Sequence, residues 1–113
     1  MHELSIVMSI IDIANGEAVK ANVSKIDEIE LEMGVLSGIE MSAFDFAWQE
    51  AVKSTVLENA ERIIVRPTGK AVCLECNTSF DMDRLFDPCP VCKSHFINIT
   101  QGKELRVKSV TIE

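Results

Sequence analysis

Hydrophobic residues in the segment 4–20 recur at intervals of three and four, the spacing of one helix face. This face consists of Leu4, Val7, Met8, Ile11, Ala14 and Ala18. Ile6, Ile10 and Ile13 widen the stripe, and a stripe this wide is typical of a helix buried against a sheet. Asn15-Gly16 is the point at which the predicted helix could end early.

Apolar and acidic residues alternate in the segment 26–33, which predicts a half-buried strand. Ile29, Leu31 and Met33 fall on one face, and Glu28, Glu30 and Glu32 fall on the other. Residues 34–40 follow as a loop. Residues 61–67 and 104–112 also have strand character. These three segments predict a small three-stranded sheet.

A second helix is predicted to begin at Ser42, whose side chain can cap free backbone amides. Asp45 lies three residues further on, as in a capping box. The apolar face of this helix would consist of Phe44, Ala47, Trp48 and Ala51. The expected fold class is therefore α+β, with two helices on a three-stranded sheet.

Residues 71–100 contain all four cysteines, and they have too few apolar groups to fold without a stabilising metal ion or disulfide. Phe80, Phe86 and Phe96 are expected to form the small core of this insert. We expect two domains: an α/β domain of residues 1–70 plus 101–113, completed by the last strand, and an inserted zinc-ribbon domain of residues 71–100.

The cysteines form two pairs, Cys73-x₂-Cys76 and Cys89-x₂-Cys92, separated by twelve residues. Two such turns facing each other supply four thiolates, the set that structural zinc prefers. A disulfide pair would need an oxidising compartment, and a redox pair would be expected near a βαβ pattern. His95 reads either as an exposed turn residue or as an accessory metal contact.

The net charge is −7, so a general nucleic-acid binder or a protein docked on anionic membranes is not expected. The N-terminal sequence lacks the features of a signal peptide, and its longest apolar run is too short to span a bilayer. We therefore expect a cytoplasmic protein. The sequence shows no set of residues typical of catalysis, so we expect no enzyme.

The first residues, Met1-His2-Glu3, are rich in nitrogen donors. The Met1 amine, the His2 imidazole and the intervening backbone amide could bind Ni(II) or Cu(II) in a plane, a geometry that does not suit zinc. The alternative is that these residues merely start the helix, with the Glu3 carboxylate favourably placed at its positive end.

Four features together resemble the HypA/HybF family of hydrogenase maturation factors: MHELS, ELEMGVLSGIE, the cysteine pairs, and GKELRVKSVTIE at the C-terminus. The resemblance covers essentially the whole chain. It implies a nickel metallochaperone that holds nickel (Ni²⁺) as transient cargo through Met1 and His2, with Glu3 in the same motif. It also places Glu40 near the nickel end as an accessory residue. Glu40 could instead simply lead the second helix.

The resemblance further implies that structural zinc (Zn²⁺) is bound by the inserted ribbon. The implied partners are the GTPase HypB and the large-subunit precursor of [NiFe]-hydrogenase, and some members also serve urease. The chain could be a monomer or a homodimer. The alternative function is a zinc-ribbon protein-interaction module without any role in nickel delivery, and a thiol redox protein is the more distant rival.

Overall fold

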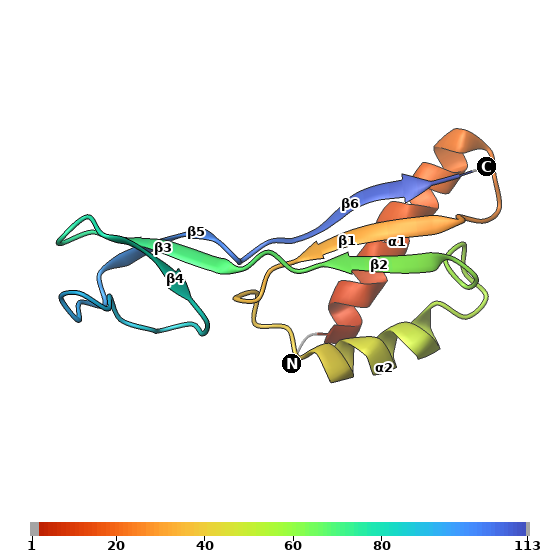
Figure 1. The fold of residues 1–113 in the computed structure, drawn as a ribbon. Coiled ribbons are helices and arrows are strands. Elements are labelled where there is room, and N and C mark those ends of the chain that lie inside the picture. Colours follow the sequence, from red (N-terminus) through yellow and green to blue (C-terminus); the bar gives the residue numbers. More distant parts are fainter. Residues whose placement is uncertain (1–2, 113) are drawn as a thin grey trace. The chain divides into compact units, whose positions relative to one another are not determined.

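The computed structural model describes residues 3–112 and confirms the α+β class. Figure 1 shows two helices and two small sheets. The described chain divides into two compact units. We call residues 3–31, 39–64 and 106–112 the helical unit, and residues 32–38 and 65–105 the cysteine unit.

The helical unit contains the predicted three-stranded sheet, in the order β2-β1-β6. Its strands are β1 (Glu28–Met33), β2 (Glu61–Val65) and β6 (Leu105–Thr111). The alternation in β1 is as predicted, because Ile29, Leu31 and Met33 are buried. The first helix, α1 (Glu3–Ala21), lies across this sheet and packs against α2 (Met41–Ala51) (Figure 1).

Helix α1 continues through Asn15-Gly16, and its buried face differs from the predicted stripe. The buried hydrophobic positions are Val7, Ile10, Ile11, Ala14 and Ala18. The sequence predicted that Leu4, Met8 and Ile13 also belong to the buried face. That prediction was wrong, because all three side chains are exposed. A single helix face against a small sheet is narrower than the run of apolar residues suggested.

The predicted start of α2 was also wrong, because the helix begins at Met41 and Glu40 is its cap. Glu40 is extended, and its carboxylate accepts the backbone N–H of Ala43 at 2.7 Å and the hydroxyl of Ser42 at 2.6 Å. Asp45 takes no part in a capping box but forms an ion pair with Arg62 at 2.7 Å. The longer glutamate side chain reaches the free amides of the first turn, which is the function of a cap.

The cysteine unit is built on a second three-stranded sheet, in the order β4-β3-β5. Strand β3 (Gly69–Cys73) pairs antiparallel with both β4 (Ser79–Met82) and β5 (Ile97–Gln101). The core of this unit consists of Leu36, Ala71 and Met82, with Phe80, Ile97 and Ile99 packed against them.

Of the three phenylalanines expected in this core, only Phe80 packs there. Phe86 and Phe96 are 84% and 69% exposed, so the prediction was wrong for both. Leu36 fills the core instead, and it comes from the loop after β1. Its backbone N–H donates to the Gly102 carbonyl at 2.7 Å, which fixes the loop on the cysteine unit.

Two glycines should respond in opposite ways to the same substitution. A Cβ at Gly34 would overlap the carbonyl of Gly102, whereas one at Gly16, inside α1, would meet no atom within 4 Å. We expect Gly34→Ala to destabilise the protein by about 1–3 kcal/mol through overpacking. Gly16→Ala should stabilise it by about 0.5–1 kcal/mol, because alanine favours helix. Urea unfolding would measure both, and equal midpoints for the two variants would contradict this packing.

Candidate metal centre

The two cysteine pairs lie in turns of the same backbone design. In the first, the N–H of Asn77 donates to the Cys73 carbonyl at 3.0 Å; in the second, the N–H of Lys93 donates to the Cys89 carbonyl at 2.9 Å. Asn77 and Lys93 both have positive φ, 62° and 65°. Lysine is an unusual choice at such a position. It nevertheless adopts the conformation that the turn requires.

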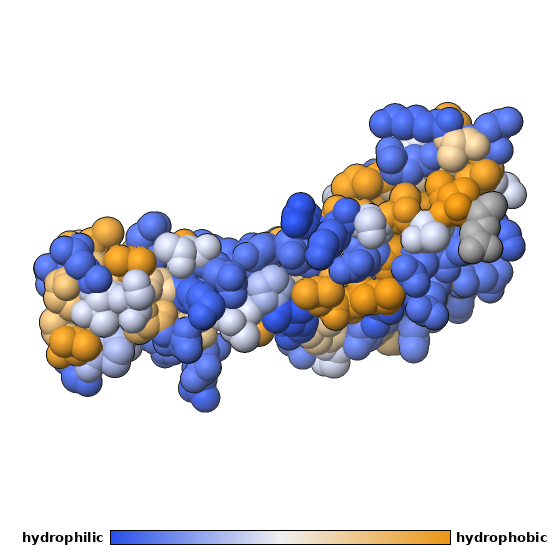
Figure 2. Space-filling model, turned by 45° about the horizontal axis from the view of Figure 1, so that its top comes forward, coloured by the Kyte–Doolittle hydropathy of each residue, from blue (hydrophilic) through white to orange (hydrophobic). Residues whose placement is uncertain are grey.

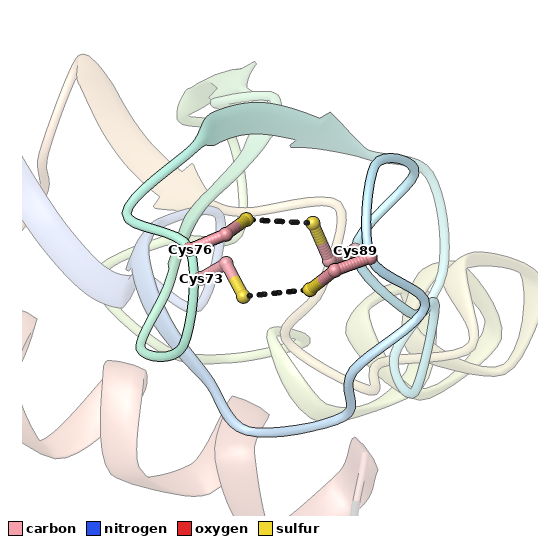
Figure 3. Close-up of side chains that lie close together, drawn as sticks. Cys73, Cys76 and Cys89 are labelled. Carbon is pink, nitrogen blue, oxygen red and sulfur yellow. Dashed lines mark hydrogen bonds between the residues drawn. The ribbon is translucent and has the colours of Figure 1, made fainter.

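The four cysteine sulfurs form one cluster, all within 4.8 Å of one another. Two contacts join the sulfurs of one turn to those of the other: Cys73 to Cys92 at 3.5 Å and Cys76 to Cys89 at 3.7 Å (Figure 3). Zinc–sulfur bonds of about 2.3 Å in a tetrahedron place sulfurs about 3.8 Å apart. The cluster therefore fits a tetrahedral metal ion held by four thiolates.

The thiols of this cluster differ in acidity when no metal is bound. Hydrogen bonding to Thr78, whose Oγ1 lies 3.1 Å from the sulfur, lowers the pKa of Cys76 to about 6. The backbone N–H of Ser94 favours the Cys92 thiolate, but hydrogen bonds with Cys73 and burial outweigh it and raise the pKa of Cys92 to about 12. A bound metal ion would take the place of the protons that the sulfurs otherwise share.

The structure does not place His95 in the sulfur cluster. The group that could hold a metal ion among the described residues contains the four cysteines and no histidine. His95 is exposed, as the simpler prediction had it. It instead borders a groove beside Phe86 and Ile97.

At the other candidate site, Met1 and His2 lie outside the described residues, and Glu3 is the first residue of α1. Glu3 is only 4% exposed, although it is charged. Its carboxylate Oε2 accepts the backbone N–H of Glu40 at 3.1 Å. This hydrogen bond is the largest cause that lowers the pKa of Glu3, and a hydrogen bond from the backbone N–H of Glu3 itself lowers it further.

Glu40 is thus adjacent to the N-terminal motif through its backbone, while its side chain caps α2. The hydroxyl of Ser42 is the first cause that lowers the pKa of Glu40, followed by the N–H of Ala43. The sequence suggested both a position near the nickel end and a place at the head of the helix. The link to Glu3 was not predicted, because no sequence pattern reports a contact between residues 37 positions apart.

The fold and the sulfur cluster together define a small metal-binding protein with an α+β unit and a four-cysteine module. Comparison with known proteins gives its family. The family model described as "Hydrogenase/urease nickel incorporation, metallochaperone, hypA" matches residues 1–112, and the chain belongs to this HypA family.

Relatives and solved structures support this assignment along the full length. A hydrogenase maturation factor HypA of Parabacteroides distasonis is 44% identical, over 100% of this chain and 98% of its own length. One from Prosthecochloris aestuarii is 36% identical, over 100% of both chains. The solution structure of the Ni metallochaperone HypA from Helicobacter pylori matches with a TM-score of 0.67 and 31% identity, covering 99% of this chain and 97% of that one.

These findings confirm the resemblance read from the sequence, and with it a role in nickel incorporation for hydrogenase. HypA is a family of metallochaperones, which confirms that the protein is not an enzyme. Membership also implies hydrogenase-related partners. In the described part of the chain, neither helix is long and apolar enough to cross a membrane.

Proposed function

We propose that this protein binds a single Ni(II) ion at its N-terminus and delivers it to a hydrogenase under assembly. The ligands would be the amine of Met1, the imidazole of His2 and backbone nitrogens, which suit the planar geometry of Ni(II). The observation that supports this proposal is the buried carboxylate of Glu3, held by the N–H of Glu40. Glu3 anchors the chain immediately after the two proposed ligands.

The four-cysteine cluster would hold structural zinc, bound by Cys73, Cys76, Cys89 and Cys92. A complete shell of four thiolates leaves no open position, so the zinc would stabilise the fold and perform no chemistry. In this proposal the nickel-binding domain comprises residues 1–70 with 101–113, and the zinc ribbon comprises residues 71–100. Any metal contact by His95 would come from this ribbon.

We propose the GTPase HypB and the large-subunit precursor of [NiFe]-hydrogenase as partners, in the cytoplasm. The relatives are hydrogenase maturation factors, and the Helicobacter pylori protein is described as a Ni metallochaperone. Those names support the role in hydrogenase assembly. The oligomeric state would be a monomer or a homodimer.

Nickel titration of zinc-loaded protein with its authentic N-terminus tests the proposal, followed by absorption spectroscopy. His2→Ala and a form with one extra N-terminal glycine should both lose the planar-type nickel spectrum, because each removes or displaces a ligand. The zinc content should stay unchanged in both. Parent-like nickel binding by both variants would exclude the terminal site and favour a zinc-ribbon interaction module without nickel function.

A further inference from the structure

The turn of residues 83–87 in the cysteine unit leaves the side chains of Leu85 and Phe86 exposed to solvent. The Asp87 carboxylate accepts the backbone N–H of Asp83 at 3.2 Å and of Arg84 at 3.1 Å, and so fixes the turn. Within it, Phe86 has a φ of 73° and is 84% exposed. A bulky residue at positive φ carries a conformational cost, and such strain concentrates at functional sites.

This turn forms one wall of a groove of about 290 Å³. Leu85 and Phe86 line it on the turn side, and Ile97 and Ile99 of β5 line it on the sheet side. Figure 2 shows that hydrophobic side chains reach the surface of the molecule. Exposed apolar groups gathered around a concave surface are typical of interaction sites.

The polar residues of the groove are His95, Lys103 and Asp87. Asp87 already receives two backbone N–H groups, which partly compensate its negative charge. His95 and Lys103 are both exposed, and within residues 3–112 neither forms an ion pair or hydrogen bond with another side chain. The groove therefore offers unused hydrogen-bond donors and a positive charge beside an apolar floor.

We propose that this groove docks a short segment of a partner protein in which apolar side chains alternate with acidic ones. The apolar residues would cover Phe86 and the two isoleucines, and a carboxylate would pair with Lys103. Complementary charge gives such contacts their specificity. Nucleic acid fits less well, because the groove offers one lysine beside an apolar floor rather than the row of cations that phosphates require.

The volume supports a peptide rather than a folded domain as the group that enters the groove. At about 290 Å³ it lies just below the range of about 300–1,000 Å³ typical of ligand sites, which is enough for a few side chains. This inference goes beyond nickel delivery, because it uses none of the proposed metal ligands. Loss of nickel binding at the N-terminus would leave it intact.

The test measures binding of fluorescein-labelled peptides to the zinc-loaded full chain by fluorescence polarisation. The probe is a short peptide that alternates Asp with Leu and Phe. One matched peptide has Lys in place of Asp, and another has Ser in place of Leu and Phe. We expect the acidic, apolar probe to bind at least about tenfold more tightly than either matched peptide.

Two variants locate the binding site, and one serves as a control. Phe86→Gly and Lys103→Glu should each weaken binding of the acidic probe by about tenfold or more. Glycine suits the positive φ at position 86, so this variant should melt no lower than the parent, and weaker binding cannot then reflect unfolding. Phe96→Ser removes another largely exposed phenylalanine, which does not line the groove, and should bind like the parent.

Several results would overturn the proposal. They are absence of binding, equal binding of the lysine peptide, and parent-like affinity of both Phe86→Gly and Lys103→Glu. A concentration-dependent increase in mass that Phe86→Gly abolishes, without peptide binding, would assign the groove to a second copy of this chain and also reject the proposal.

Discussion

Removing the zinc ion proposed for the cysteine cluster, or replacing Cys89 by Ser, is expected to unfold the cysteine unit and to leave the helical unit folded. Apart from the cysteines, the core of the cysteine unit is a cluster of three buried side chains, Leu36, Ala71 and Met82, which is too small to stabilise a fold alone. Structural zinc supplies about 10–16 kcal/mol in small zinc-dependent modules, and this free energy is also free energy of folding. Loss of the metal should therefore unfold this unit completely.

The single tryptophan makes the two units separable in this experiment. Trp48 is 7% exposed in α2, and Arg62 lies 5.3 Å from the centre of its ring. Its fluorescence should stay native after chelation, while proteolysis begins within residues 74–96. Val91→Ser is the matched control, because Val91 is exposed between Cys89 and Cys92 and supplies no sulfur. A native protease pattern without zinc, or a simultaneous change at Trp48, would contradict independent folding.

The three strands of the helical unit could be predicted from the sequence, because alternation has a strict physical cause. In β1 every second side chain faces the core, so Ile29, Leu31 and Met33 identified both the strand and its buried face. The cysteine pairs were equally informative, since two thiolates from one turn require that spacing. Their sulfurs do converge in the structure.

The errors arose where tertiary contacts override local preference. Ser42 and Asp45 matched a capping box, but Asp45 pairs with Arg62, and Glu40 reaches the free amides instead. Phe86 was assigned to a core because phenylalanine is usually buried. The Asp87-fixed turn holds it in solvent, and no periodic pattern could have predicted that.

Contacts between distant segments were the part that the sequence did not reveal. Leu36 reads as a loop residue, yet it completes the core of the cysteine unit. Glu3 reads as a first-turn acid near the helix dipole, and that effect alone would not require burial. The N–H of Glu40 explains why a charged side chain can be buried there, because buried charges need hydrogen-bond partners.

Replacing Glu3 by Ala is expected to weaken nickel binding at the proposed terminal site by about 10–100-fold, the usual effect of losing a group that orients a metal ligand. Without the carboxylate, the start of α1 would lose its hydrogen bond to the N–H of Glu40, and we expect the position of the proposed ligands to become less restricted. Glu3→Gln keeps an oxygen acceptor for that N–H and should lose less. Competition with a nickel-binding dye would measure each affinity.

Acid unfolding gives an independent test of the same contact. Because the pKa of Glu3 is lowered in the folded protein, its ionised form stabilises the fold above the ordinary carboxyl range. That contribution is lost as the pH falls through the lowered pKa, so parent and Glu3→Ala should become equally stable at low pH. Asp12→Ala removes an exposed acid from the same helix and should change neither nickel affinity nor acid stability. If Glu3→Ala behaves like Asp12→Ala in both measurements, the carboxylate does not position the nickel ligands.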